Sequence, residues 1–105
     1  MEQEVVILVK VISKLKKLET ILYKMSYFSF QDSCELYVNK IFDTIHSIPD
    51  LKHTKTHNPK YGEWFVRHKP NRKTTYYITF SRKADRYLIK NIISNHEEEY
   101  LEVVG

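Results

Sequence analysis

The chain has 105 residues, a formal net charge of +4 and a hydrophobic content of 42%. This length suits one domain with its own core, and the composition excludes a fibrous or an intrinsically disordered chain. Two glycines and one cysteine argue against a glycine-rich phosphate loop, an internal disulfide and a thiolate zinc finger. No signal-peptide core and no apolar run long enough to span a bilayer is found, which predicts a cytoplasmic protein.

The first apolar segment, Glu4–Ile12, is short and rich in β-branched residues, which predicts a strand. Ser13 follows it as a candidate N-cap. Leucines and isoleucines then recur at helical spacing as far as Met25, with lysines on the opposite face. These residues predict a first helix that follows the strand directly.

A second helix is expected after an aromatic break at residues 26–30. Asp32 or Ser33 is its candidate N-cap, and apolar residues at helical spacing continue to Ile48. Pro49 ends the helix because it lacks a backbone N–H. Two helices joined by a short break predict an antiparallel helix hairpin.

The second half of the chain has the pattern of a β-meander. Residues 51–60 are polar and aperiodic, which predicts a loop. Three strand-like runs follow, at Glu63–Lys69, Thr74–Phe80 and Tyr87–Ser94, and their short connections favour antiparallel pairing. Residues 97–105 are expected to form a partly ordered acidic tail.

The predicted order is therefore β-α-α-β-β-β, an α+β fold. We expect a single domain over residues 1–96, with the helix hairpin packed on one face of a mainly antiparallel four-stranded sheet.

The charge is concentrated in one stretch of the chain. Residues 51–96 carry eleven lysines and arginines against two acidic residues, a net charge of +9, whereas residues 1–50 sum to −1 and residues 97–105 to −4. The same basic stretch holds four of the five histidines. This pattern is typical of a nucleic-acid-binding surface, although solvated lysines at a sheet edge would give the same charge.

Two stretches, GEWFVRHKPNRKTTYYITF and DRYLIKNIISNH, together with the element order, resemble the RelE/ParE family of bacterial toxins, in its plasmid stabilization branch. The resemblance spans nearly the whole chain and implies the toxin of a type II toxin–antitoxin system, held inactive by a cognate proteic antitoxin. RelE-like members cleave mRNA on the ribosome, whereas ParE-like members inhibit DNA gyrase and are not nucleases. Both functions remain open, as does a basic interaction module without toxicity.

His96 is the first candidate for acid–base chemistry, because the ordinary pKa of histidine suits proton transfer at neutral pH. Its surroundings, SNHEEEY, also resemble family members that use a histidine as general acid. The alternative is a surface histidine beside a polar tail. The resemblance further implies that Arg72 or Lys73 contacts the scissile phosphate, and the strand register decides which of the two points inward.

Five further residues are candidates for binding RNA: Arg67, Lys69, Lys55, Lys60 and Tyr100. Arg67 and Lys69 lie two apart on one strand and are expected to line one groove, with Trp64 and Val66 in the core. Lys55 and Lys60 are carried over from the basic loop of RelE-like nucleases, and Tyr100 from an aromatic residue that follows the family's histidine and can stack on a base.

The remaining candidates are weaker. His53 and His57 have a spacing that a metal would accept, but no third ligand is fixed, so neither a metal nor another cofactor is expected. Cys34 is expected to be buried and without chemistry. The sequence also departs from RelE-like nucleases, which usually carry an arginine near the end of the last strand, where this chain has Asn95 and His96.

Overall fold

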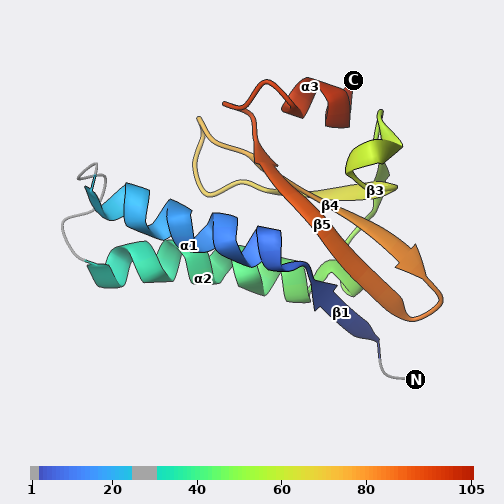
Figure 1. Cartoon of the computed structure of the whole chain (residues 1–105), viewed down its shortest axis with the longest axis horizontal. Coiled ribbons are helices and arrows are strands. Elements are labelled where there is room, and N and C mark those ends of the chain that lie inside the picture. The colour runs from blue at the N-terminus through green and yellow to red at the C-terminus, as the bar shows by residue number, and fades with distance from the viewer. Residues whose placement is uncertain (1–2, 25–30) are drawn as a thin grey trace.

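Two long helices cover one face of a five-stranded mixed sheet with the order β1-β5-β4-β3-β2 (Figure 1). The computed structural model describes residues 3–24 and 31–105. The helices and strands are β1 (Glu4–Ile7), α1 (Val9–Lys24), α2 (Gln31–His46), β2 (Thr54–Lys55), β3 (Trp64–His68), β4 (Tyr76–Lys83), β5 (Arg86–Ser94) and α3 (Tyr100–Val104), with 3₁₀ turns at Ile48–Asp50 and Pro59–Tyr61. The predicted α+β class is confirmed.

The predicted number of strands is wrong. The segment expected to be a loop contains β2, which pairs antiparallel with β3 through two residues and adds a fifth strand at the sheet edge. β1 is parallel to β5, whereas the other pairs are antiparallel. So short a strand has no period of its own, and its position depends on the neighbouring strand.

The first strand is also shorter than its sequence predicts. β1 ends at Ile7, and α1 begins at Val9, so Ser13 lies inside the helix and does not cap it. Val11 and Leu15, four residues apart, share the helix face that packs on the sheet, and both are 1% exposed. Burial of this face outweighs the preference of β-branched residues for strands.

The second helix begins before its predicted caps, because Gln31 is already helical. The aromatic break at residues 26–30 lies outside the described residues. The helix ends at His46, and Pro49 lies in the 3₁₀ turn that follows it. α1 and α2 run antiparallel along one face of the sheet, as the hairpin prediction requires (Figure 1).

The two faces of the sheet hold separate cores. Toward α1 and α2, a large cluster includes Val66, Ile78 and Phe80. Toward α3, a small cluster joins Phe65, Ile93 and Val103. Neighbouring strand residues thus point to opposite faces, as strand geometry requires.

The acidic tail is an ordered part of the fold. α3 lies across the sheet from α1 and α2 (Figure 1), and Val103 is fully buried. Backbone N–H groups of His57 and Asn58 donate to carbonyls of Val103 and Glu102 at 2.8 Å each. The sequence predicted a partly ordered tail and not α3, because charged residues flank the buried position of this short helix.

A glycine marks the closest approach between the loop and the sheet. Gly62 has φ of +146°, and a Cβ there would lie 2.9 Å from the backbone N of Phe80. The strand pairing shifts register at this point, between Thr79 and Phe80. The Thr79 hydroxyl donates to the Tyr61 carbonyl at 2.6 Å, which fixes the loop against the irregularity.

Candidate functional site

A groove of about 630 Å³ opens between α1, α2 and the adjoining ends of β4 and β5. We call it the His96 groove. Its lining residues are Leu18, Ile21, Leu22, Tyr37, Asn71, Lys73, Thr74, Tyr76, Ser94 and His96. One wall is therefore apolar and helical, whereas the other carries the candidate catalytic histidine and a lysine.

His96 lies in the turn that follows β5. Its side chain is exposed, and its Nε2 is 3.1 Å from the hydroxyl oxygen of Thr74. The backbone N–H of His96 donates to Ser94 Oγ at 3.3 Å. The imidazole is thus held beside the start of β4 and remains accessible from the groove.

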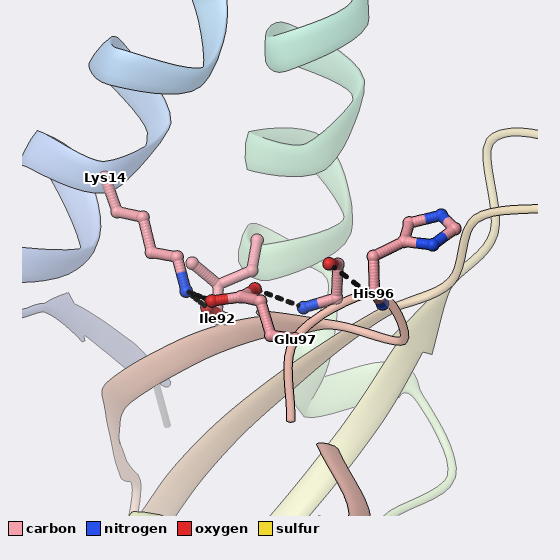
Figure 2. A network of polar contacts seen from close by, with 5 residues as sticks. Lys14, Ile92, His96 and Glu97 are labelled. Carbon is pink, nitrogen blue, oxygen red and sulfur yellow. Dashed lines mark hydrogen bonds and ion pairs between the residues drawn. The ribbon is translucent and has the colours of Figure 1, made fainter. Parts of the chain in front are cut away.

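The turn is tied to α1 by the next residue, Glu97 (Figure 2). Lys14 donates to Glu97 Oε1 at 2.6 Å and to the Ile92 carbonyl at 2.5 Å. The other carboxylate oxygen of Glu97 accepts the Ser94 N–H at 2.7 Å. The ring of His96 points away from this ion pair. Glu97 therefore anchors the turn, a role that its place in an acidic run did not reveal.

Asn95 secures the other side of the turn. Its Oδ1 accepts the Thr75 N–H at 2.9 Å, and its Nδ2 donates to the Lys73 carbonyl at 3.0 Å. Asn71 in turn accepts the N–H groups of Lys73 and Thr74 at 2.9 Å each. The residue that stands where RelE-like nucleases usually carry an arginine is therefore used to join two chain segments.

The structure distinguishes between the two basic residues at the start of β4. Lys73 lines the His96 groove, whereas Arg72 is exposed on the same loop and does not line it. Lys73 is thus the residue that the fold places with His96.

The structure places Arg67 and Lys69 in different surroundings. Trp64 and Val66 do pack on the helix-side core, as predicted. The guanidinium of Arg67 lies over the rings of Phe65 and Tyr77, at 5.0 and 5.8 Å. Lys69 lies beyond the end of β3 and lines a different groove, next to α2. The strand alternation ends before Lys69, so the two-residue spacing no longer fixes its face.

The other predicted RNA contacts are also dispersed. Tyr100 stacks on Tyr77, with ring centroids 6.1 Å apart, on the face toward α3. Lys55 lies on the edge strand β2, and the ammonium of Lys60 lies 5.2 Å from the ring of Tyr61. None of these three predicted contacts lines the His96 groove.

A second groove, of about 450 Å³, adjoins α2 and the end of β3. We call it the His68 groove; its lining residues are Ser33, Leu36, Tyr37, Lys40, His68, Lys69 and Pro70. Tyr37 lines both grooves, and its hydroxyl is 3.1 Å from that of Tyr76. Burial and this hydrogen bond raise the pKa of Tyr76 well above its ordinary value.

His68 is the residue that the sequence did not single out for function. Its Nδ1 is 2.7 Å from the hydroxyl oxygen of Thr44, and its Nε2 is buried with no hydrogen-bond partner among the described residues. Burial, and then the charge of Lys40, lower the pKa of His68. Only the tertiary packing of β3 on α2 creates this environment.

The remaining candidates, His53 and Cys34, contact the protein's own backbone and core. The Nε2–H of His53 donates to the Ile48 carbonyl at 3.1 Å, and the ring of His53 lies 4.9 Å from that of Phe80. Cys34 is buried as predicted, and burial raises the pKa of its thiol. Within residues 3–24 and 31–105, no group of three or more histidine, cysteine or acidic side chains is arranged to hold a metal.

The His96 groove therefore combines a group that can transfer a proton with a cation that can stabilise charge on a phosphate.

Within the described chain, no helix has the length and hydropathy needed to cross a membrane. Comparisons of the chain with protein-family models, curated proteins and solved structures find no match. A functional assignment must therefore begin from these residues.

Proposed function

We propose that this chain is the toxin of a type II toxin–antitoxin pair and that it cleaves mRNA on the ribosome without a metal. The observation that carries the proposal is the meeting of His96 and Lys73 in one groove. The concentration of positive charge in residues 51–96 supports a polyanionic substrate. The sequence resemblance to the RelE/ParE toxins supports the same function.

The reaction uses a nucleophile that RNA itself supplies. The ribose 2′-hydroxyl attacks the adjacent phosphorus and gives its proton to solvent water, and the bond to the 5′ oxygen breaks. His96 protonates this leaving oxygen as general acid, and Lys73 stabilises the negative charge that develops at phosphorus. The products are a 2′,3′-cyclic phosphate and a 5′-hydroxyl. No serine or cysteine nucleophile is required, so the buried Cys34 has no part in the reaction.

Cleavage of an mRNA bound to purified ribosomes tests the proposal. We expect cleavage with 2′,3′-cyclic phosphate ends, and a loss of about 100-fold or more in His96→Ala, which is typical when a general acid is removed. Lys73→Met should lose about 100-fold, as when one stabilising donor is lost. The matched control is Lys83→Met, because Lys83 is exposed at the far end of β4. Full activity in both groove variants would refute the assignment.

Expression in bacteria distinguishes the proposal from the alternatives. An mRNA endonuclease should stop translation rapidly and leave cleaved transcripts. Filamentation with a DNA-damage response, without RNA cleavage, would instead indicate a ParE-type gyrase inhibitor and would contradict the proposed chemistry. Growth unaffected by the wild-type chain would indicate a basic interaction module.

The proposed antitoxin is a protein that covers the hairpin and the groove together. Ile21 and Leu36 are 53% and 57% exposed, and each lines one of the two grooves. An apolar segment bound there would remove these side chains from water and close access to His96. Co-expression with the product of an adjacent gene should then restore growth, whereas a toxin with no rescuing neighbour would contradict the pairing.

A further inference from the structure

The His68 groove has a cationic wall that the fold leaves unneutralised. Lys40 comes from α2 and Lys69 from the loop after β3, and both side chains are exposed. Neither lysine forms an ion pair with any described residue, although Lys14 and Arg86 both do. Among the described side chains, no acidic one lines this groove. Two cations from separate elements thus converge on one concave surface, and no described side chain there supplies a counter-charge.

His68, which lines the groove, carries a buried polar atom without a hydrogen-bond partner among the described residues. The Thr44 hydroxyl donates to the Lys40 carbonyl at 3.2 Å, so its oxygen is free to accept the Nδ1–H of His68 at 2.7 Å. In that tautomer Nε2 carries a lone pair, and this buried atom has no partner among the described residues. An unsatisfied buried polar atom costs about 1–3 kcal/mol. Protonation turns this lone pair into an N–H donor, which an anionic acceptor in the groove can satisfy.

We propose that the His68 groove binds a backbone phosphate of single-stranded RNA through Lys40 and Lys69. The phosphate supplies the counter-charge that both lysines lack. Once Lys40 is neutralised, the protonated form of His68 is favoured, and Nε2 then carries a proton that an anion in the groove stabilises. One phosphate would therefore supply both the counter-charge for the two lysines and a hydrogen-bond partner for His68.

The position of the groove connects it to the proposed active site. Tyr37 lines both grooves. An RNA strand that leaves one groove can therefore continue into the other past this single side chain. The inference rests on the proposed function for the identity of the ligand as RNA. The His68 groove would thus hold a second RNA phosphate, separate from the scissile phosphate in the His96 groove.

Binding of an RNA that cannot be cleaved tests this site independently of catalysis. The probe is a fluorescent single-stranded hexamer with 2′-O-methyl groups, measured by anisotropy at several salt concentrations. Lys40→Gln and Lys69→Gln should each weaken binding about 3- to 10-fold and reduce the salt slope by about 0.7, the value for one contact to a single strand. Lys17→Gln is the matched control, since Lys17 is exposed on α1 and lines neither groove.

The imidazole signals of His68 provide a second readout. Its pKa should rise when the hexamer binds, and this rise should be absent in Lys40→Gln. The other titratable groups that surround the ring are Lys69, Tyr37 and Tyr76, so Tyr37→Phe serves to exclude a contribution from the tyrosine pair. Inorganic phosphate alone, at the same phosphate concentration, tests for a site that takes free anions.

Each result has one interpretation. Wild-type affinity in both lysine variants, with cleavage still dependent on His96, would overturn this site and leave the proposed function intact. Weakened binding together with His96-independent cleavage would support the site and refute the proposed active site. A rise in the His68 pKa with inorganic phosphate but not with RNA would overturn the RNA phosphate as ligand.

Discussion

The two faces of the sheet differ in how their polar side chains are satisfied. On the face toward α3, the Tyr61 hydroxyl donates to Glu102, Thr79 donates to Tyr61, and the guanidinium of Arg67 rests on aromatic rings. On the groove side, the ammonium groups of Lys40 and Lys69 form no ion pair with a described residue, and the Nε2 of His68 has no hydrogen-bond partner among them. On the α3 face, these polar groups are paired within the chain, whereas the groove side has polar groups available to a ligand.

This difference shows why positive charge alone did not locate the site. Arg67 and Lys60 contribute to the basic stretch as much as Lys73 does, but both lie over aromatic rings of the same chain. Cation–π contacts of this kind stabilise the fold by about 0.5–1 kcal/mol at exposed sites. The side chains of Lys69 and Lys73, which line the two grooves, make no such contact with a described residue.

The largest expected effect on stability is at Gly62, where the loop approaches β4 most closely. Gly62→Ala should lower the free energy of unfolding by about 3 kcal/mol, because a Cβ would meet the Phe80 backbone and φ is +146°. Chemical denaturation measures this loss. The matched control is Ala84→Gly in the β4–β5 turn, where φ is +54° and glycine is favoured. Equal destabilisation by both changes would contradict the close approach.

A smaller loss is expected in α3. Val103→Ala should cost roughly 2 kcal/mol, because the side chain is fully buried against Phe65 and Ile93. Leu101→Ala, in the same helix but 57% exposed, should change stability by less than about 0.5 kcal/mol. Thermal and urea unfolding compare the two. If Val103→Ala were as mild as Leu101→Ala, the tail would not be part of the core.

On the groove side, His68 should make stability depend on pH. Its pKa is lowered in the folded state by burial and by Lys40, so below about pH 6.5 the unfolded chain binds a proton that the folded chain does not. Stability should therefore fall as pH drops from about 6.5 toward the lowered pKa, with a slope of at most about 1.4 kcal/mol per pH unit.

Urea unfolding at a series of pH values measures this slope. His68→Gln should remove the component, and Lys40→Gln should reduce it because one cause of the lowered pKa is lost. Superimposable pH profiles for the wild type and His68→Gln would show that the histidine is not held neutral by its surroundings.

The smallest effect on stability is expected at the anchor of the His96 turn. Lys14→Met and Arg86→Gln each break an exposed ion pair and should each cost under about 1 kcal/mol. Only Lys14→Met should also lower mRNA cleavage, by about 3- to 30-fold, since a displaced catalytic group reacts poorly. Lys14→Arg should retain most activity. Equal cleavage by the Lys14→Met and Arg86→Gln variants would show that the ion pair does not position His96.

The sequence predicted most of what depends on local patterns. The three long strands, the helix hairpin and the core-facing positions of Trp64 and Val66 follow from periodicity, which burial on one face enforces. The end of β1 was missed because residues 8–12 have strand-like composition, but residues 9–12 form the start of a helix that packs on the sheet. β2 and α3 are too short to show a period.

The candidate site was predicted only in part. His96 and Lys73 were identified from chemistry and from the resemblance, and the structure brings them into one groove. The separation of Arg67 from Lys69, and of Tyr100 from His96, depends on where β3 ends and on the packing of α3. The surroundings of His68 arise from contacts between α2 and β3, which are far apart in the sequence.

The central claim is that RNA binds on the groove side of the sheet and not on the α3 face. Amide NMR spectra of the wild-type chain, titrated with the 2′-O-methyl hexamer, test it most directly. We predict the largest shift changes at residues 69–75 and 94–97 and in α2 near Tyr37 and Lys40, with α3 unaffected. Shift changes concentrated on Arg67, Tyr77 and Tyr100, with none around His96, would contradict the account.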